Sequence, residues 1–148
     1  MAVITTDILL SGIRREEAFT WMSEFSHHRS FLSGAFQVAE TNRPKVLELT
    51  FKGTFKTRSF EYELHQIDNA HGGRRIKIKT SGKRTSGLLS YSLRTMKPSS
   101  NTLLTIHFDY QPGSLLGQIL DQISLNEALE RCWSQVAQQI AAEINNGK

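Results

Sequence analysis

Two charged residues are the side chains of this sequence best placed for chemistry. The strand alternation described below directs Glu40 and Arg58 toward the interior. An inward arginine can hold a carboxylate or a phosphate with its guanidinium fork, and an inward glutamate can act as a base if its surroundings shift its protonation. The alternative is that a β-bulge or a strand end returns either side chain to solvent.

Histidines are the second group with chemical potential. His27 and His28 follow the first expected helix, and imidazole serves both acid–base chemistry and metal binding. The other histidines are dispersed over outer strand positions and one turn: His65, His71 and His107. Because no HxH, HExxH or CxxC spacing occurs, we expect no metal site and no cofactor, and the sequence identifies no catalytic residue. The lone cysteine, Cys132, is expected to be a small core residue.

The composition suits one ordinary globular domain that spans residues 1–148. A single cysteine cannot form an internal disulfide, so the cytoplasm is the expected location. No apolar run approaches the roughly 18 residues of a membrane span, so we expect none. Lys and Arg outnumber Asp and Glu by 18 to 14, and the resulting net charge of +4 permits an anionic partner without requiring one.

Strand-like and helix-like segments follow one another in a simple order. The pattern predicts a strand over Val3–Leu10, a helix over Arg14–Phe25 and a short helical turn over His27–Gly34. Six more strands fit before residue 111, and Ser114 is the expected N-cap of a long final helix. The apolar stripe of that helix comprises Leu116, Leu120, Ile123, Leu129, Trp133, Val136, Ile140 and Ile144.

The expected turns predict which residues of neighbouring strands face each other. A turn at Asn69–Gly73 sets Tyr62 opposite Ile78 and Glu63 opposite Lys77. The resulting cross-strand pairs join apolar side chains on one face and opposite charges on the other, as antiparallel pairing favours.

Two further pairings concern the inward charges. A two-residue turn at 53–54 sets Arg58 opposite Leu49. The predicted turn between the second and third strands sets Glu40 opposite Leu47. A turn through 82–87 carries the same apolar face into the next strand. The first strand is expected to pair with the seventh.

The inner face that this register defines is apolar and rich in aromatic rings. The ligand-contacting residues predicted on it and on the final helix are Phe36, Val38, Glu40, Leu49, Phe51, Arg58, Phe60, Tyr62, Ile78, Tyr91, Leu93, Ile106, Phe108, Tyr110, Trp133 and Val136. A curved sheet around one helix leaves a gap that suits a flat or amphipathic organic molecule. The alternative is a solid core, because protein interiors pack with few voids.

Four segments make the chain resemble the START-like, or SRPBCC, helix-grip superfamily over nearly its whole length. They are VITTDILLSGIRREEAFTWMSEFSHHRSFLSG, FEYELHQID, GLLSYSLRTM and TLLTIHFDYQPGSLLGQILDQI. The resemblance implies an α+β helix-grip domain: a seven-stranded curved antiparallel sheet wrapped around a long C-terminal helix, with short helices after the first strand. It also implies a hydrophobic ligand between sheet and helix, as in the polyketide cyclase/dehydrase and coenzyme Q-binding branches.

We therefore expect this chain to bind or transport a small hydrophobic molecule of aromatic, polyketide-like or isoprenoid/lipid type, as a monomer or homodimer and without a DNA partner. One alternative is a polyketide cyclase/aromatase or dehydratase-type enzyme. The other is a ribosome-associated or quinone-handling accessory protein.

A cluster of basic residues is compatible with binding to RNA or the ribosome. The favoured explanation of the cluster is a solvated protein surface. The members of the cluster are Arg74, Arg75, Lys77, Lys79, Lys83, Arg84, Arg94 and Lys97.

Overall fold

The computed structural model describes residues 2–53, 56–69, 74–97, 100–112 and 119–147. Its elements are β1 (Ala2–Leu10), α1 (Arg15–Ser23), α2 (Phe25–Leu32), β2 (Gln37–Glu40), β3 (Val46–Lys52), β4 (Thr57–Asp68), β5 (Arg75–Gly82), β6 (Ser86–Met96), β7 (Asn101–Gln111) and α3 (Ile119–Asn146). In these ranges the strands form one antiparallel sheet in the order β1-β7-β6-β5-β4-β3-β2.

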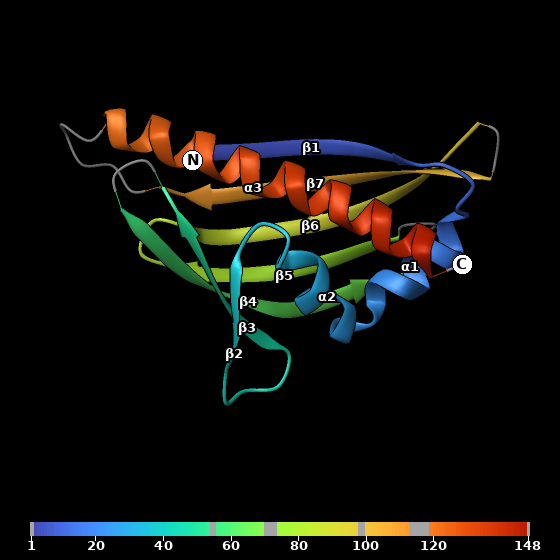
Figure 1. Ribbon diagram of the computed structural model, residues 1–148, viewed down its shortest axis with the longest axis horizontal. Helices are drawn as coiled ribbons and strands as arrows, with labels where there is room; N and C mark the ends of the chain where they lie inside the picture. Colours follow the sequence, from blue (N-terminus) through green and yellow to red (C-terminus); the bar gives the residue numbers. More distant parts are fainter. Residues whose placement is uncertain (1, 54–55, 70–73, 98–99, 113–118, 148) are drawn as a thin grey trace.

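The sheet curves around α3, which crosses one of its faces from the β1 side, while α1 and α2 lie on the same side nearer the C-terminal end of α3 (Figure 1). The 28 residues of α3 extend over about 42 Å at 1.5 Å per residue. This arrangement confirms the predicted α+β helix grip. It also confirms the pairing of the first strand with the seventh, in which Ile4 faces Phe108.

The inner face of the sheet is apolar, as the alternation predicts. On β7 every second residue is buried, and the same rhythm runs through β5 and β6. The predicted inward aromatic residues are at most 5% exposed: Phe36, Phe51, Phe60, Tyr62, Tyr91, Phe108, Tyr110 and Trp133. The terminal helix and the concave side of the sheet therefore share one core.

The predicted register between β4 and β5 is wrong by two residues. Tyr62 faces Thr80 instead of Ile78, and Glu63 faces Lys79 instead of Lys77. The strands meet at a later point of the connection than predicted, and the register then slips by one residue at a bulge between Leu64 and Gln66. Next to the connection the pairing differs from the prediction by three residues, with Ile67 opposite Ile76, and the bulge reduces this offset to two at Tyr62. Because two is an even number, Phe60, Tyr62 and Leu64 keep their predicted face.

A similar shift affects β3 and β4. The last pair of the two strands is Lys52 with Thr57, and the Gly53 amide donates to the Lys56 carbonyl at 2.9 Å, so four residues separate the paired ends where two were predicted. Arg58 consequently faces Phe51 instead of Leu49. Glu40 does face Leu47, as predicted.

One residue of the predicted helical stripe is misplaced. Ile123 is 51% exposed, whereas Leu125 is buried. At 3.6 residues per turn, Ile123 lies about 120° around the helix from Leu129, and Leu125 only about 40°. The predicted cap Ser114, the stripe residue Leu116 and the side chain of Leu120 lie outside the described residues.

Membrane-spanning helices were sought in the part of the chain that the structure describes. None of its helices is both long enough and apolar enough to cross a bilayer.

Candidate ligand-binding site

Aromatic rings gather between the inner face of the sheet and α3. We call this set the aromatic cluster; its members are Phe36, Phe51, Phe60, Phe108, Tyr110 and Trp133. Phe36 lies at its centre, with its ring centroid 5.1 Å from that of Trp133 and 5.8 Å from that of Phe60. These tilted and edge-to-face contacts are the arrangements that aromatic quadrupoles favour.

Two polar groups lie within this cluster. The Tyr110 hydroxyl donates to Asn126 Oδ1 at 2.9 Å, and burial raises the pKa of Tyr110 to about 12. The indole Nε1 of Trp133 is buried and has no hydrogen-bond partner among the described residues. Because an unsatisfied buried donor costs about 1–3 kcal/mol, this N–H is a place where an acceptor would bind favourably.

A second polar group of residues lies deeper, where α2 meets β4 and β6. His28 Nδ1 is 2.6 Å from the Tyr62 hydroxyl, which is 2.7 Å from the Tyr91 hydroxyl. His28 Nε2 lies 2.7 Å from the Met22 carbonyl oxygen. All three side chains are at most 1% exposed, so we call them the buried triad.

The proton positions in the buried triad follow from its partners. A carbonyl oxygen only accepts, so His28 Nε2 carries a hydrogen and donates it to Met22. Burial lowers the pKa of His28 to about 4, so at neutral pH its Nδ1 is an acceptor and Tyr62 donates to it. Tyr91 then donates to Tyr62. Burial also raises the pKa of both tyrosines, which keeps them protonated.

The buried triad predicts a pH-dependent stability. Unfolded His28 takes up a proton near its ordinary pKa of 6.5, whereas the folded protein keeps it neutral down to about pH 4. In that window the unfolded state binds more protons, so stability falls as the pH falls. We expect the free energy of unfolding to be about 2 kcal/mol lower at pH 5 than at pH 8 through this group.

Urea denaturation at a series of pH values measures this loss. His28→Gln should be less stable at pH 8 and should lose this part of the slope. A wild-type slope that persists unchanged in His28→Gln would contradict the assignment.

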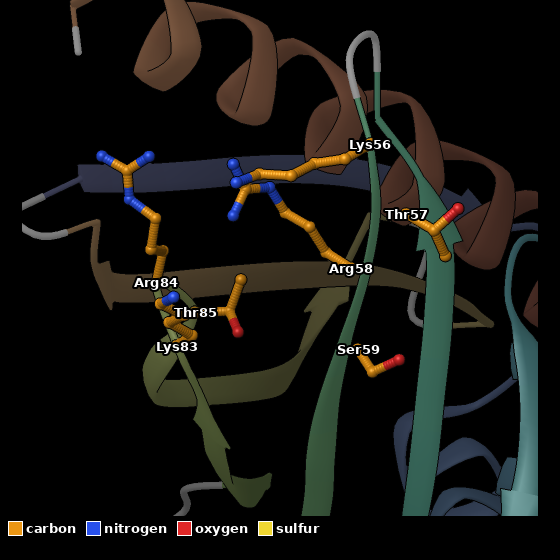
Figure 2. Close-up of a pocket in the computed structure, with 7 residues that line it drawn as sticks. All are labelled: Lys56, Thr57, Arg58, Ser59, Lys83, Arg84 and Thr85. Atoms are coloured by element: carbon orange, nitrogen blue, oxygen red, sulfur yellow. The ribbon is translucent and has the colours of Figure 1, made fainter.

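A cavity of about 220 Å³ opens at the end of the grip where the β3–β4 and β5–β6 connections meet (Figure 2). We call it the cationic cavity; its lining residues are Lys56, Thr57, Arg58, Ser59, Lys83, Arg84 and Thr85. In Figure 2 the side chains of Lys56 and Arg58 extend from the β4 side toward the side occupied by Arg84. Strand alternation explains this direction, because Arg58 shares the inner face of β4 with Phe60 and Tyr62.

The β5–β6 connection is fixed by hydrogen bonds of its own. Ser86 Oγ accepts from the Gly82 amide at 3.0 Å and donates to the Gly82 carbonyl at 2.8 Å. Thr80 Oγ1 donates to the Thr85 carbonyl at 2.6 Å. Arg84 Nε donates to the Pro112 carbonyl at 2.8 Å, which ties the connection to the end of β7. These bonds hold Arg84 and Thr85 in place at the wall of the cavity.

A groove of about 460 Å³ lies on the other side of the β3–β4 hairpin. We call it the hairpin groove; its lining residues are Ser33, Gly34, Ala35, Phe36, Gln37, Thr50, Phe51, Lys52 and Thr57. Phe36 and Phe51 belong to the aromatic cluster, and Thr57 also borders the cationic cavity. The groove therefore leads from the surface to the cluster.

The structure places the predicted site residues in three environments. Most are in the core, and those at most 5% exposed are Phe36, Leu49, Phe51, Phe60, Tyr62, Ile78, Tyr91, Leu93, Ile106, Phe108, Tyr110, Trp133 and Val136. Arg58 is half-buried at the cationic cavity, and Val38 is half-buried on β2.

The prediction that Glu40 points inward is wrong. Its side chain is 68% exposed and forms an ion pair with Arg29. It is the last residue of a four-residue edge strand, so the strand end returns it to solvent.

The described residues offer few groups for catalysis. They contain no set of three His, Cys, Asp or Glu side chains close enough to hold a metal ion. Both nitrogens of His28 are engaged, and burial raises the pKa of Cys132 to about 11, which leaves it a neutral thiol. The aromatic cluster itself contains only one titratable group, Tyr110.

Sequence reasoning misses three features of the site. The imidazole of His28 is chemically interesting in itself, but its partner Tyr62 is 34 residues away. Lys56 is not singled out by the sequence, although it shares the two-residue rhythm of Arg58 and Phe60. The orphan hydroxyl of Thr85 depends on the shape of one turn, for which the sequence carries no signal.

Comparison with known proteins gives a likeness in structure alone. The fold is similar to that of a protein from Thermus thermophilus, with a TM-score of 0.71 at 7% identity over 99% of each chain. It is similar to the ZhuI aromatase/cyclase from a Streptomyces species, with a TM-score of 0.66 at 11% identity over 98% of this chain and 94% of that one.

A third similar structure is a point mutant of norcoclaurine synthase from Thalictrum flavum in complex with a transition-state analogue. Its TM-score is 0.62 at 15% identity, over 99% of this chain and 95% of that one. No protein-family model and no curated protein sequence matches the chain. The chain has the helix-grip fold of these proteins, and at this identity the likeness extends to the fold alone.

Proposed function

We propose that this protein binds a small hydrophobic molecule with an aromatic or isoprenoid-like body, and that it acts as a carrier and not as an enzyme. The apolar part of the ligand enters by the hairpin groove and packs on Phe36, Phe51 and Trp133. The observation that carries the proposal is the indole N–H of Trp133. This N–H is surrounded by aromatic rings and has no hydrogen-bond partner among the described residues.

Two other observations support this location. The hairpin groove is lined by two rings of the aromatic cluster, Phe36 and Phe51, so its inner wall borders that cluster. Aromatic side chains with a few placed polar groups are the usual lining of small-molecule sites. The neighbours in fold include an aromatase/cyclase and a norcoclaurine synthase complex, so a small organic molecule is compatible with this architecture.

Binding is favoured over catalysis because general acid–base chemistry needs an accessible group that titrates near neutral pH. His28 is buried with both nitrogens bonded, and the pKa of Tyr110 is about 12. The described aromatic cluster can therefore hold and orient a molecule, and it offers no proton donor or acceptor suited to pH 7.

The Trp133→Phe variant tests this proposal with two matched naphthalenes. Acetylnaphthalene carries a carbonyl acceptor, and ethylnaphthalene has the same size without one. We expect wild type to bind both in equilibrium dialysis, and Trp133→Phe to bind acetylnaphthalene about fivefold more weakly, since a hydrogen bond contributes about 1 kcal/mol. Ethylnaphthalene affinity should stay within about twofold.

Trp21→Phe is the matched control. Trp21, in α1, stacks on His27, in α2, and lies outside the aromatic cluster. It should leave both affinities unchanged. If neither naphthalene binds to the wild type, or if Trp133→Phe weakens both equally, the proposed role of the indole N–H is wrong.

A further inference from the structure

The cationic cavity has an unusual lining for a surface hollow. Of its seven described lining residues, four are Lys or Arg, three are Ser or Thr, and none is acidic. Together these side chains make the hollow a region of positive potential, which attracts anions. The two basic signals in the sequence, Arg58 and the 82–87 connection, meet here although they lie about 25 residues apart in the chain.

The arginines of the cavity provide geometry as well as charge. A guanidinium presents several N–H donors in one plane and can hold two oxygens of a carboxylate or phosphate together. Arg84 is half-buried and anchored through Nε to the Pro112 carbonyl, and Arg58 is half-buried on the opposite wall. Lys56 and Lys83 are exposed at the rim, where they add charge at the entrance.

An independent observation points to a ligand at the same place. Thr85 is 2% exposed, and its Oγ1 is buried without a hydrogen-bond partner among the described residues. The hydroxyl occupies the space left by the missing side chain of Gly82, where an added Cβ would lie 2.3 Å from Thr85 Oγ1. The hydroxyl points to Gly82 and away from the basic side chains (Figure 2), but Thr85 itself lines the cavity, so a rotation about its Cα–Cβ bond would present this donor to an anion oxygen there.

The cavity also adjoins the aromatic cluster. An added Cβ on Gly82 would lie 2.7 Å from Phe60 Cβ, so Thr85 and Phe60 flank the same glycine. Arg58 precedes Phe60 by two residues on the inner face of β4. A charged side chain, Arg58, and an aromatic one, Phe60, thus lie next to each other on the inner face of β4. An amphipathic ligand needs such a pair of neighbouring surfaces.

We propose that the cationic cavity binds the anionic group, a carboxylate or a phosphate, of an amphipathic small molecule. This inference deepens the proposed function and rests on it for the position of the apolar part. Arg58 and Arg84 hold the anion from opposite walls, and Thr85 Oγ1 donates a hydrogen bond to it.

A small molecule fits this site better than RNA. The cavity is a hollow of about 220 Å³ between two strand connections, which suits one or a few oxyanion groups. Nucleic acid binding typically uses an extended basic face that neutralises many phosphates and weakens steeply with salt.

Three naphthalene ligands of similar size test the inference by isothermal titration: naphthoate, naphthyl phosphate and the neutral naphthalenemethanol. We expect at least one anion to bind about tenfold or more tightly than the alcohol. The stronger of the two anions identifies the source as a carboxylate or a phosphate. Equal affinity for all three would overturn the inference and leave the proposed function intact.

Variants locate the anion. Arg58→Gln and Arg84→Gln should each weaken the preferred anion about tenfold, and should leave the alcohol within about twofold. Arg94→Gln, which removes the same charge from an exposed position on β6, should change neither affinity.

Thr85→Val separates binding from folding. It should weaken anion binding about threefold or more without lowering the thermal midpoint, because the lost hydroxyl has no partner among the described residues to leave unsatisfied.

Unchanged anion affinity in all three cavity variants would contradict the site. Loss of RNA binding in the arginine variants, with no preference for any naphthalene anion, would also overturn it. Anion binding that depends on Arg58 but not on Trp133 would keep the inference and count against the proposed function.

Discussion

Tyr62→Phe is expected to lower the free energy of unfolding by about 3 kcal/mol, although it removes a single oxygen atom. That hydroxyl donates to His28 Nδ1 and accepts from Tyr91, at 2.6 Å and 2.7 Å. Its loss leaves a buried donor on Tyr91 and a buried acceptor on His28 without partners. Chemical denaturation of the variant at pH 8 measures the effect.

Tyr91→Phe is the matched control for Tyr62→Phe. It removes the first member of the chain, so Tyr62 still donates to His28 and only one acceptor position of Tyr62 becomes vacant. We expect a loss of about 1 kcal/mol. Equal losses in the two variants, or a larger loss in Tyr91→Phe, would mean that the hydrogen bonds run in the opposite direction.

Gly87→Ala is expected to destabilise the fold by about 3 kcal/mol or more, and to lower the thermal midpoint by roughly 10 °C. An added Cβ on Gly87 would lie 2.0 Å from the Asp109 carbonyl oxygen and 2.7 Å from Tyr110 Cα. Both obstacles are backbone atoms of the paired strand β7, so no side-chain rotation relieves the clash. The strands must separate beside the aromatic cluster.

Gly34→Ala distinguishes a backbone clash from a general effect of adding a methyl group. The added Cβ would lie 3.3 Å from Gln139 Cγ, which belongs to a flexible side chain. Its thermal midpoint should stay within about 2 °C of the wild type. A Gly87→Ala protein that melts like Gly34→Ala would contradict the close approach of β6 and β7.

The faces of the sheet are easier to predict from the sequence than its register. Alternation along β7 indicates which side chains point inward, and Ile106 and Phe108 are buried as expected. The length of the connection after β4 and the bulge after Leu64 leave no trace in that alternation. The predicted pairing is therefore wrong by two residues while the faces are right.

The two inward charges show how far such reasoning extends to the site. Arg58 does lie on the inner face of β4, yet near the end of the strand, because the preceding turn is two residues longer than predicted. Glu40 has the predicted partner in β3, but its strand ends there and the carboxylate reaches solvent beside Arg29. Whether Arg58 and Glu40 are buried or exposed depends on how close each lies to the end of its strand. The periodicity of the sequence carries no information about where a strand ends.

Contacts between distant segments could not be predicted. The buried triad joins residues 28, 62 and 91 through three elements, and no local pattern connects them. The cationic cavity likewise combines two connections that adjoin because β4 pairs with β5 in a register, with Phe60 opposite Gly82, that differs from the predicted one. The aromatic cluster, in contrast, follows largely from alternation, because each ring except Phe36, which directly precedes β2, occupies an inward position of its own strand or helix.

The two ends of the grip differ in chemistry. At the α1–α2 end, the buried triad is fully hydrogen-bonded and gives rigidity. Thr85 Oγ1 at the opposite end and Trp133 Nε1 in the aromatic cluster are buried without partners among the described residues. Satisfied polar groups stabilise a fold, whereas unsatisfied ones beside a hollow are suited to a ligand.

Native mass spectrometry of the purified protein, before and after incubation with a mixture of lipophilic acids, is the decisive test of ligand binding. We expect a one-to-one adduct with an acid, which Trp133→Phe and Arg58→Gln each reduce. The mass of the bare chain alone in both spectra, at acid concentrations well above the micromolar range, would contradict it.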